Sequence, residues 1–160
     1  MSGAQTFLLG VKALREEYAD ALEDYARLRE SATKTTSRLS GVSVSGTKDP
    51  HKDGVVIALA DADERMMKMK ERLRAETLLA ESLILKVPNP LHCDLLRLRY
   101  LNGLEWRHVQ RALEQTREQT VTARTIYNYH NAALDAAETV WEKGLYDTRY
   151  REIKKRYPLA

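Results

Sequence analysis

The segment from Leu95 to Val109, LLRLRYLNGLEWRHV, places the end of one helix directly before the start of the next. Leucine recurs at helical spacing through its first half, and Asn102-Gly103 interrupts that pattern. Gly103 can adopt the positive backbone angle that a sharp reversal between two helices requires. The apolar residues expected to form a small core between these helices are Leu95, Leu98, Trp106, Val109 and Leu113. The segment therefore predicts a tightly connected pair of helices.

A third helix is expected from about Ala123 to Lys143, with Gly144 as its stop. Thr122 is the candidate N-cap, because a threonine hydroxyl can accept a hydrogen bond from a free amide of the first turn. The positions expected to face inward, at helical spacing, are Ile126, His130, Ala133 and Leu134. His130 is interpreted as a packing residue and not as a ligand.

The outward positions of this third helix carry side chains of the kind that read DNA. In a helix-turn-helix the first turns of the recognition helix enter the major groove, where arginine pairs with guanine and asparagine with adenine. The base-reading candidates are Arg124, Thr125, Tyr127, Asn128 and Asn131. The candidates for phosphate contacts, which supply much of the affinity for DNA, are Arg107, Arg111, Arg117 and Thr122. The alternative interpretation is a solvated face on a structural three-helix module.

Two long helices are expected before this module. From Phe7 to Leu28 apolar residues alternate at spacings of four and three, a heptad seam that one helix cannot bury alone. A second, less pure seam between Val55 and Leu85 includes Val56, Leu59, Met66, Leu73, Ala80 and Ile84, together with Asp63, Lys70 and Thr77. The segment 31–54 is rich in Ser, Thr, Gly, Lys and Asp and predicts a flexible loop. The first helix therefore needs a partner helix, either the second one or a helix of another copy.

The prolines of Pro88-Asn89-Pro90 end the helical pattern and mark a boundary. We therefore predict an all-α protein in three parts. A long antiparallel, coiled-coil-like helical hairpin spans residues 1–87, a helix-turn-helix module spans 91–143, and a basic amphipathic helical tail spans 144–160. The tail is expected either to hold phosphates or to fold back so that its tyrosines cover the hairpin.

Composition argues against several classes of protein. Cys93 is the single cysteine, so an intrachain disulfide and a cysteine-rich zinc site are excluded, and a reducing compartment, the cytoplasm, is expected. His51, His92 and His108 have no ligand spacing, so we expect no metal and no cofactor. No apolar run approaches the roughly 20 residues that cross a bilayer, so no membrane partner is expected. No nucleophile motif, phosphate-binding loop or paired carboxylates occur, so we expect no catalytic residues and no enzyme.

The pattern resembles a family of small phage and prophage proteins in which a helical hairpin precedes a domain similar to the fourth region of sigma factors. The resemblance is carried by residues 95–106, LLRLRYLNGLEW, and by residues 122–134, TARTIYNYHNAAL. Phage transcription regulators of the ArpU and RinA type are similar, and the order of parts covers Phe7 to Leu134. The chain departs from the family in the longer, glycine-free segment 114–121, where either the second helix is extended or the turn has become a loop.

The resemblance implies sequence-specific binding to double-stranded DNA and a role in regulating phage or prophage transcription. RNA polymerase is a second candidate partner. The hairpin is expected to form a homodimer, which would help a weak reading head to bind a two-part site. Two alternatives stay open: a small terminase-like DNA-packaging component, and a module that contacts RNA polymerase in place of DNA.

Overall fold

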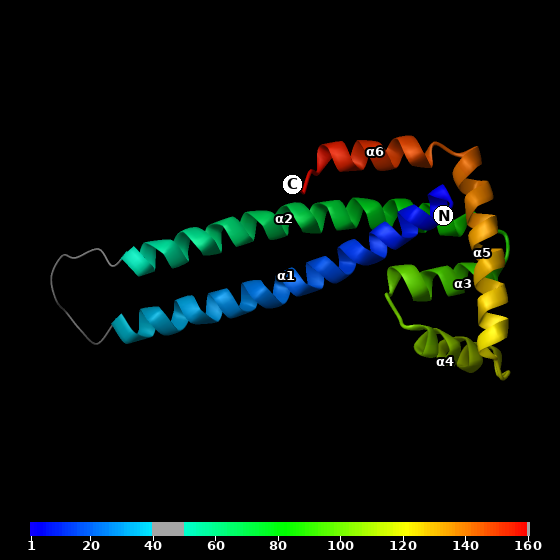
Figure 1. The fold of residues 1–160 in the computed structure, drawn as a ribbon, viewed down its shortest axis with the longest axis horizontal. Helices are drawn as coiled ribbons and strands as arrows, with labels where there is room; N and C mark the ends of the chain where they lie inside the picture. Colours follow the sequence, from blue (N-terminus) through cyan, green and yellow to red (C-terminus); the bar gives the residue numbers. More distant parts are fainter. Residues whose placement is uncertain (40–49, 160) are drawn as a thin grey trace.

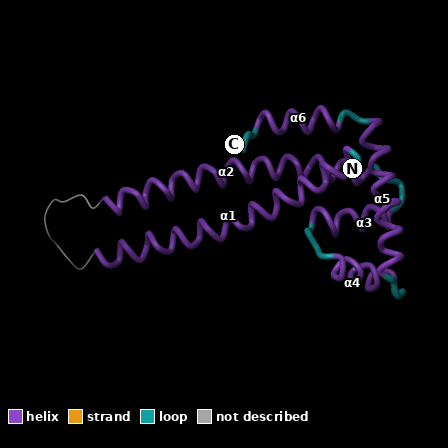
Figure 2. The backbone as a smooth tube through the Cα atoms, in the orientation of Figure 1, coloured by secondary structure: helices purple, strands orange, loops and turns teal. Residues whose placement is uncertain are grey.

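The structure is a computed structural model that describes residues 1–39 and 50–159. Every regular element in these ranges is a helix, so the predicted all-α class is confirmed. The elements are α1 Gly3–Leu39, α2 Pro50–Leu85, α3 Pro90–Leu96, the π-helix η1 Arg97–Leu101, α4 Trp106–Arg117, α5 Ala123–Lys143 and α6 Tyr146–Arg156. Short connections link the helices from α2 onward (Figure 2).

The two longest helices, α1 and α2, lie side by side and antiparallel and form an arm that extends away from α3, α4 and α5 (Figure 1). The seam predicted on α1 is present, with Phe7 and Val11 fully buried near the other helices. Farther along the same seam, Tyr18 and Tyr25 are only half-buried. Burial therefore decreases toward the far end of the arm, where the two helices have only each other to pack against.

The seam on α2 differs from the predicted one at Val56, Asp63 and Lys70, whereas the predicted Ile84 is buried and Thr77 is half-buried. The buried and half-buried residues that recur at spacings of four and three are Val55, Leu59, Ala62, Met66, Met69, Leu73, Glu76, Ala80 and Leu83. Val56 was expected on the seam, but it is 59% exposed. Ala62 and Met69 take the places that the sequence pattern assigned to Asp63 and Lys70, which are exposed. The two patterns share every second residue, but the observed seam is apolar at eight of its nine positions and the predicted seam at only six of nine, so the sequence itself favours the observed one.

The loop predicted over residues 31–54 is wrong at both ends, because α1 continues to Leu39 and α2 begins at Pro50. The central part of that prediction, residues 40–49, lies outside the described residues. Ser, Thr and Lys cost a helix at most about 0.7 kcal/mol each relative to Ala, so an established helix can continue through them. Lys34 Nζ lies 2.9 Å from Glu30 Oε1, an i,i+4 ion pair that adds local support. Pro50 suits the first helical position, where no amide donor is needed.

A main core joins the arm to the rest of the protein. Its buried residues come from the first turns of α1, the last turns of α2, the end of α3, η1, the second half of α5 and the start of α6. They include Phe7, Leu8, Leu83, Ile84, Leu96, Tyr100, Ala133, Ala137, Trp141 and Tyr146. Residues of all three predicted parts thus belong to one cluster.

Glu138 of α5 caps the first turn of α1. The amides of Gly3 and Ala4 donate to its two carboxylate oxygens at 3.3 and 2.7 Å. The free amides at a helix start need such acceptors, and a negative charge there interacts favourably with the helix dipole. Beside this contact, Gly3 packs so closely on Trp141 that a Cβ at position 3 would lie 2.5 Å from Trp141 Nε1. Glu138 and Trp141 therefore fix α5 against the start of the arm.

The C-terminal tail folds back along α2, as one of the two sequence alternatives proposed (Figure 1). Tyr146 is 1% exposed, and Tyr150 packs edge-on against Phe7 with ring centroids 4.8 Å apart. Arg72 on α2 donates to Glu76 Oε1 at 2.9 Å and to the Tyr157 carbonyl oxygen at 3.5 Å. Glu76 is 1% exposed, and a buried carboxylate needs such a partner. Arg72 thus holds both the buried charge and the end of the tail.

Replacing Glu138 with alanine removes the cap of α1. We expect Glu138→Ala to lower the free energy of unfolding by about 1–2 kcal/mol, because two amides lose their acceptor and the dipole loses its counter-charge. Glu142→Ala is the matched control: this exposed residue one turn later should change the stability by less than about 0.5 kcal/mol. Urea denaturation followed by circular dichroism measures both. Equal effects of the two substitutions would contradict the capping role.

Candidate nucleic-acid interface

A small core lies under α4 and the first half of α5. It consists of Leu91, Leu95, Val109, Leu113, Val121 and Ile126. The prediction of Leu95, Val109 and Leu113 as core residues is therefore confirmed, and Leu98 packs against this cluster. Trp106 was also expected in the core, but it is 36% exposed. It occupies the first turn of α4, so its ring lies at the edge of the small core.

The chain reverses direction before α4 with the positive backbone angle that the sequence predicted for Gly103. Gly103 has a φ of 69°, a conformation that costs other residues about 1–2 kcal/mol. The five residues of η1 form a wide helical turn, in which the Asn102 amide donates to the Arg97 carbonyl at 2.9 Å. The Leu104 amide then closes the reversal by donating to the Leu98 carbonyl at 3.0 Å. The sequence predicted a helix through this segment but not its change to π geometry.

Four polar and aromatic side chains form a stack that connects this reversal to α5. The guanidinium of Arg99 lies 4.6 Å from the centroid of the Trp106 ring, and the Trp106 ring meets the His130 ring edge-on at 4.6 Å. His130 Nε2 lies 2.8 Å from the Tyr100 hydroxyl, within hydrogen-bond distance. Arg99 also donates to the Leu104 carbonyl at 2.9 Å. His130 of α5 therefore packs against η1 and α4, which agrees with its interpretation as a packing residue.

Burial shifts the pKa values of two members of this stack. It lowers the pKa of His130 below the usual 6.5, and the positive charge of Arg99 acts in the same direction. Burial raises the pKa of Tyr100 above 10.0, against a smaller opposing effect of Arg99. At neutral pH the pair is therefore a neutral imidazole beside a neutral phenol.

The connection between α4 and α5 resolves the question left open for segment 114–121. Helix α4 continues to Arg117 and ends at Glu118, which has a φ of 52° in place of the glycine usual at such a stop. Side chains of α4 then hold Val121: its amide donates to Glu114 Oε1 at 3.0 Å, and its carbonyl accepts from Gln110 Nε2. The Val121 side chain fills the small core. The second helix is thus extended, and Val121 fixes where α5 begins.

Thr122 caps α5 as predicted. Its Oγ1 accepts from the Thr125 amide at 3.2 Å and lies 2.9 Å from Thr125 Oγ1. The predicted inward positions are confirmed: Ile126, Ala133 and Leu134 are buried, and His130 is half-buried.

The outward side of α5 is open to solvent over its first three turns. Arg124, Asn128 and Asn131 are exposed, and the ring of Tyr127 is 64% exposed. These four positions follow i, i+3, i+4 and i+7, so they share one helix face. Thr125 departs from the expected set because it is half-buried and its hydroxyl contacts that of Thr122. The exposed face of α5 therefore contains four of the five side chains that were proposed from the sequence as base-reading residues.

The candidate phosphate contacts Arg107, Arg111, Arg117 and Thr122 are all exposed. Arg107 lies 3.3 Å from Glu105 Oε2, and both side chains of this pair are at least 70% exposed. An exposed pair of this kind contributes only about 0–1 kcal/mol, so it leaves Arg107 free to exchange partners. The structure therefore places these three arginines at the surface of α4 and Thr122 at the start of α5.

A cavity of about 600 Å³ lies between α4 and α5, next to the exposed face. It is lined by Trp106, Arg107, Gln110, Ala123, Ile126, Tyr127 and His130. Sequence reasoning missed the contribution of Gln110 and placed Trp106 below the surface. The exposure of Trp106 could have been expected from its position in the first turn of a helix. No local feature of the sequence identified Gln110 as a residue that lines the cavity.

Among residues 1–34 and 54–159, no group of three or more His, Cys, Asp or Glu side chains is placed to hold a metal ion. None of the described helices combines the length and apolar character needed to cross a membrane. No family model, curated protein or solved structure matches the chain.

The shifted pKa of His130 predicts that the protein loses stability in acid. Below about pH 6.5 the unfolded chain binds a proton at this histidine, whereas the folded chain resists it until its own lower pKa is reached. The free energy of unfolding should therefore fall as the pH drops from 7 toward 5, and His130→Gln should show a smaller fall. Urea denaturation at a series of pH values tests this, and an equal pH dependence in the variant would disprove it.

Proposed function

We propose that this chain is a sequence-specific DNA-binding regulator of phage or prophage transcription, acting by binding and not by catalysis. In this proposal α4 and α5 form a helix-turn-helix, and the first turns of α5 enter the major groove. The observation that carries the proposal is the exposure of Arg124, Tyr127, Asn128 and Asn131 on one face of a helix whose opposite face is fixed in two cores. Neither the arm nor α6 covers this half of α5 (Figure 1).

The chemistry of that face suits direct reading of base pairs. Arginine can donate two hydrogen bonds to guanine, and asparagine can pair with adenine through one donor and one acceptor. Arg124 and Asn128 are separated by four residues and therefore lie one above the other on the helix. The Tyr127 ring beside them offers an apolar surface for a thymine methyl group.

The surroundings of the face support contacts to the DNA backbone. Arg107, Arg111 and Arg117 are exposed along α4 and can approach phosphates on either side of the groove. The start of α5 adds free backbone amides at the positive end of the helix dipole. These contacts would position the protein, and the face of α5 would select the sequence.

The arm offers a surface through which two copies can pair. Val56, Met67, Leu78 and Leu85 are each at least 59% exposed on α2. Their successive spacings of eleven, eleven and seven residues correspond to nearly whole numbers of helical turns, so they form one stripe along α2. Two copies joined along this stripe would present two reading heads to a two-part site. A ring of many copies in solution would instead favour a DNA-packaging component.

A second candidate function is a module that docks on another protein, such as RNA polymerase. It is favoured by the cavity between α4 and α5, where Trp106 and Tyr127 expose aromatic surface. Aromatic residues around a groove are typical of protein interfaces. The two functions differ in salt dependence, since binding through phosphate contacts weakens steeply as salt rises.

The double variant Arg124→Ala, Asn128→Ala tests the proposed reading face, which consists of Arg124, Tyr127, Asn128 and Asn131. DNA fragments that the protein enriches from phage and host genomes supply the ligand, and fluorescence anisotropy measures the affinity. Each lost bidentate contact removes about 1–3 kcal/mol, so the specific affinity should fall about 10-fold or more. Binding to unrelated DNA should change much less, and the unfolding temperature should stay the same because both side chains are exposed.

Lys155→Ala provides the matched control, since it removes a positive charge from the exposed surface of α6. It should leave the specific affinity within about 2-fold of the unaltered protein. If the double variant retained full specific affinity, or if Lys155→Ala weakened binding equally, the exposed face of α5 would not be the surface that reads the sequence. An enriched ligand that is bound without salt dependence would favour the docking module.

A further inference from the structure

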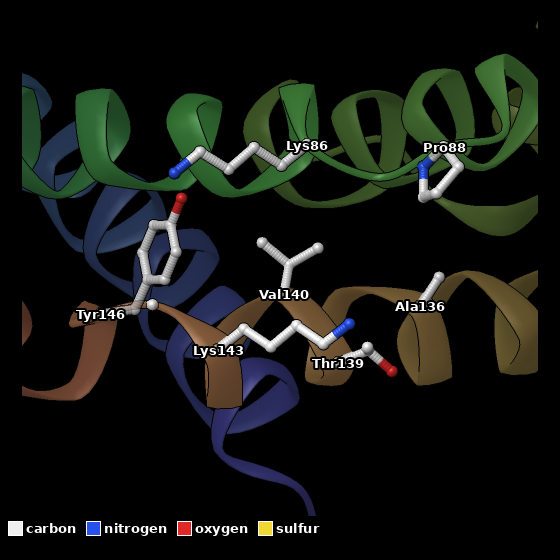
Figure 3. Close-up of a pocket in the computed structure, with 8 residues that line it drawn as sticks. Lys86, Pro88, Ala136, Thr139, Val140, Lys143 and Tyr146 are labelled. Atoms are coloured by element: carbon white, nitrogen blue, oxygen red, sulfur yellow. The ribbon is translucent and has the colours of Figure 1, made fainter.

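A second cavity, of about 520 Å³, lies on the other half of α5, away from the reading face. It is bounded by the end of α2, by the second half of α5 and by the start of α6 (Figure 3). Its apolar wall consists of Pro88, Ala136, Val140 and the ring of Tyr146. The volume falls within the range of about 300–1,000 Å³ that is typical of small-molecule sites.

The charged groups that line this cavity are all positive. Lys86, in the connection after α2, and Lys143, on α5, extend along opposite sides of it (Figure 3). No carboxylate is among its lining residues. Within the described part of the chain neither lysine forms an ion pair. Two ammonium groups beside an apolar wall are complementary to a ligand with one anionic end and an apolar body.

The aromatic wall of the cavity is held in place from several sides. Tyr146 is 1% exposed, its hydroxyl lies 3.3 Å from Ser82 Oγ, and its ring stacks on Trp141 at 6.0 Å. Gly144 allows this placement, because a Cβ at position 144 would lie 2.6 Å from the Tyr146 ring. The wall is therefore formed before any ligand arrives, which lowers the cost of binding.

The charged donors at the cavity suit a small anionic group. The Thr139 hydroxyl already donates to the Asp135 carbonyl at 3.1 Å, so the two lysines are the charged donors that remain. No arginine, whose planar fork suits phosphate, lines the cavity. The Lys86 ammonium lies 5.2 Å from the centroid of the Tyr146 ring, whereas the Lys143 side chain points toward the other end of the cavity (Figure 3).

We propose that this cavity binds a small amphipathic carboxylate. Its apolar body lies against Pro88, Ala136 and Val140, and its carboxylate contacts Lys143, while Lys86 adds a second positive charge at the other end of the cavity. Because the cavity joins the end of α2 to α5, an occupant strengthens the connection between the arm and the helix that carries the reading face. Binding at this cavity does not depend on the proposed function in DNA recognition.

The probe for the test is 4-phenylbutyrate, and 4-phenylbutanamide is its uncharged counterpart. Isothermal titration calorimetry on the full chain should show saturable binding of the acid, at least about 10-fold tighter than binding of the amide. Bound acid should also raise the unfolding temperature. Chemical-shift changes at the methyl groups of Ala136 and Val140 should place the acid in this cavity.

Two sets of variants test separately the contribution of the lysine charges and the contribution of the open cavity volume to binding. Lys86→Met with Lys143→Met should abolish the preference for the acid over the amide, whereas Lys155→Met, an exposed lysine on α6, should keep it. Ala136→Phe should fill the cavity and weaken both ligands, with its unfolding temperature reporting whether the fold is kept. The proposal is overturned if the acid does not bind saturably, if acid and amide bind equally, or if the lysine pair leaves the preference intact.

Discussion

The structure depends on the anchoring of the second half of α5 against the start of α1. Glu138 accepts the amides of Gly3 and Ala4, and Trp141 packs on Gly3 and on Phe7, with a ring separation of 5.3 Å from Phe7. Both contacts join chain segments more than 130 residues apart in sequence. With this half of α5 fixed, its first half extends past the main core and keeps one face in solvent.

Two cores share α5, and each fixes a different part of it. The main core takes Ala133, Ala137 and Trp141, and the small core takes Ile126 near the start of the helix. His130 lies between them and connects both to η1 through Tyr100. The exposed face of α5, the proposed reading face, is therefore held from behind, as precise contact with DNA would require. The same arrangement leaves separate cavities on either half of α5.

Features set by one or two local residues were predictable from the sequence. The reversal at Gly103, the cap at Thr122 and the inward positions of α5 each follow from local geometry or spacing. Features that depend on residues distant in the sequence could not be predicted from it. The position of Val121, for example, depends on two side chains of α4. The helical segments 31–39 and 50–54 were missed because the propensities involved differ by only a few tenths of a kcal/mol.

The central claim is that the exposed face of α5 contacts DNA while the rest of the helix stays fixed. Nuclear magnetic resonance of the side-chain amides, during titration with an enriched DNA fragment, tests it most directly. The account predicts large shifts for Asn128 and Asn131, and no shift for Asn89, whose side chain caps α3. Unchanged signals from Asn128 and Asn131, with shifts confined to α6 or the arm, would contradict it.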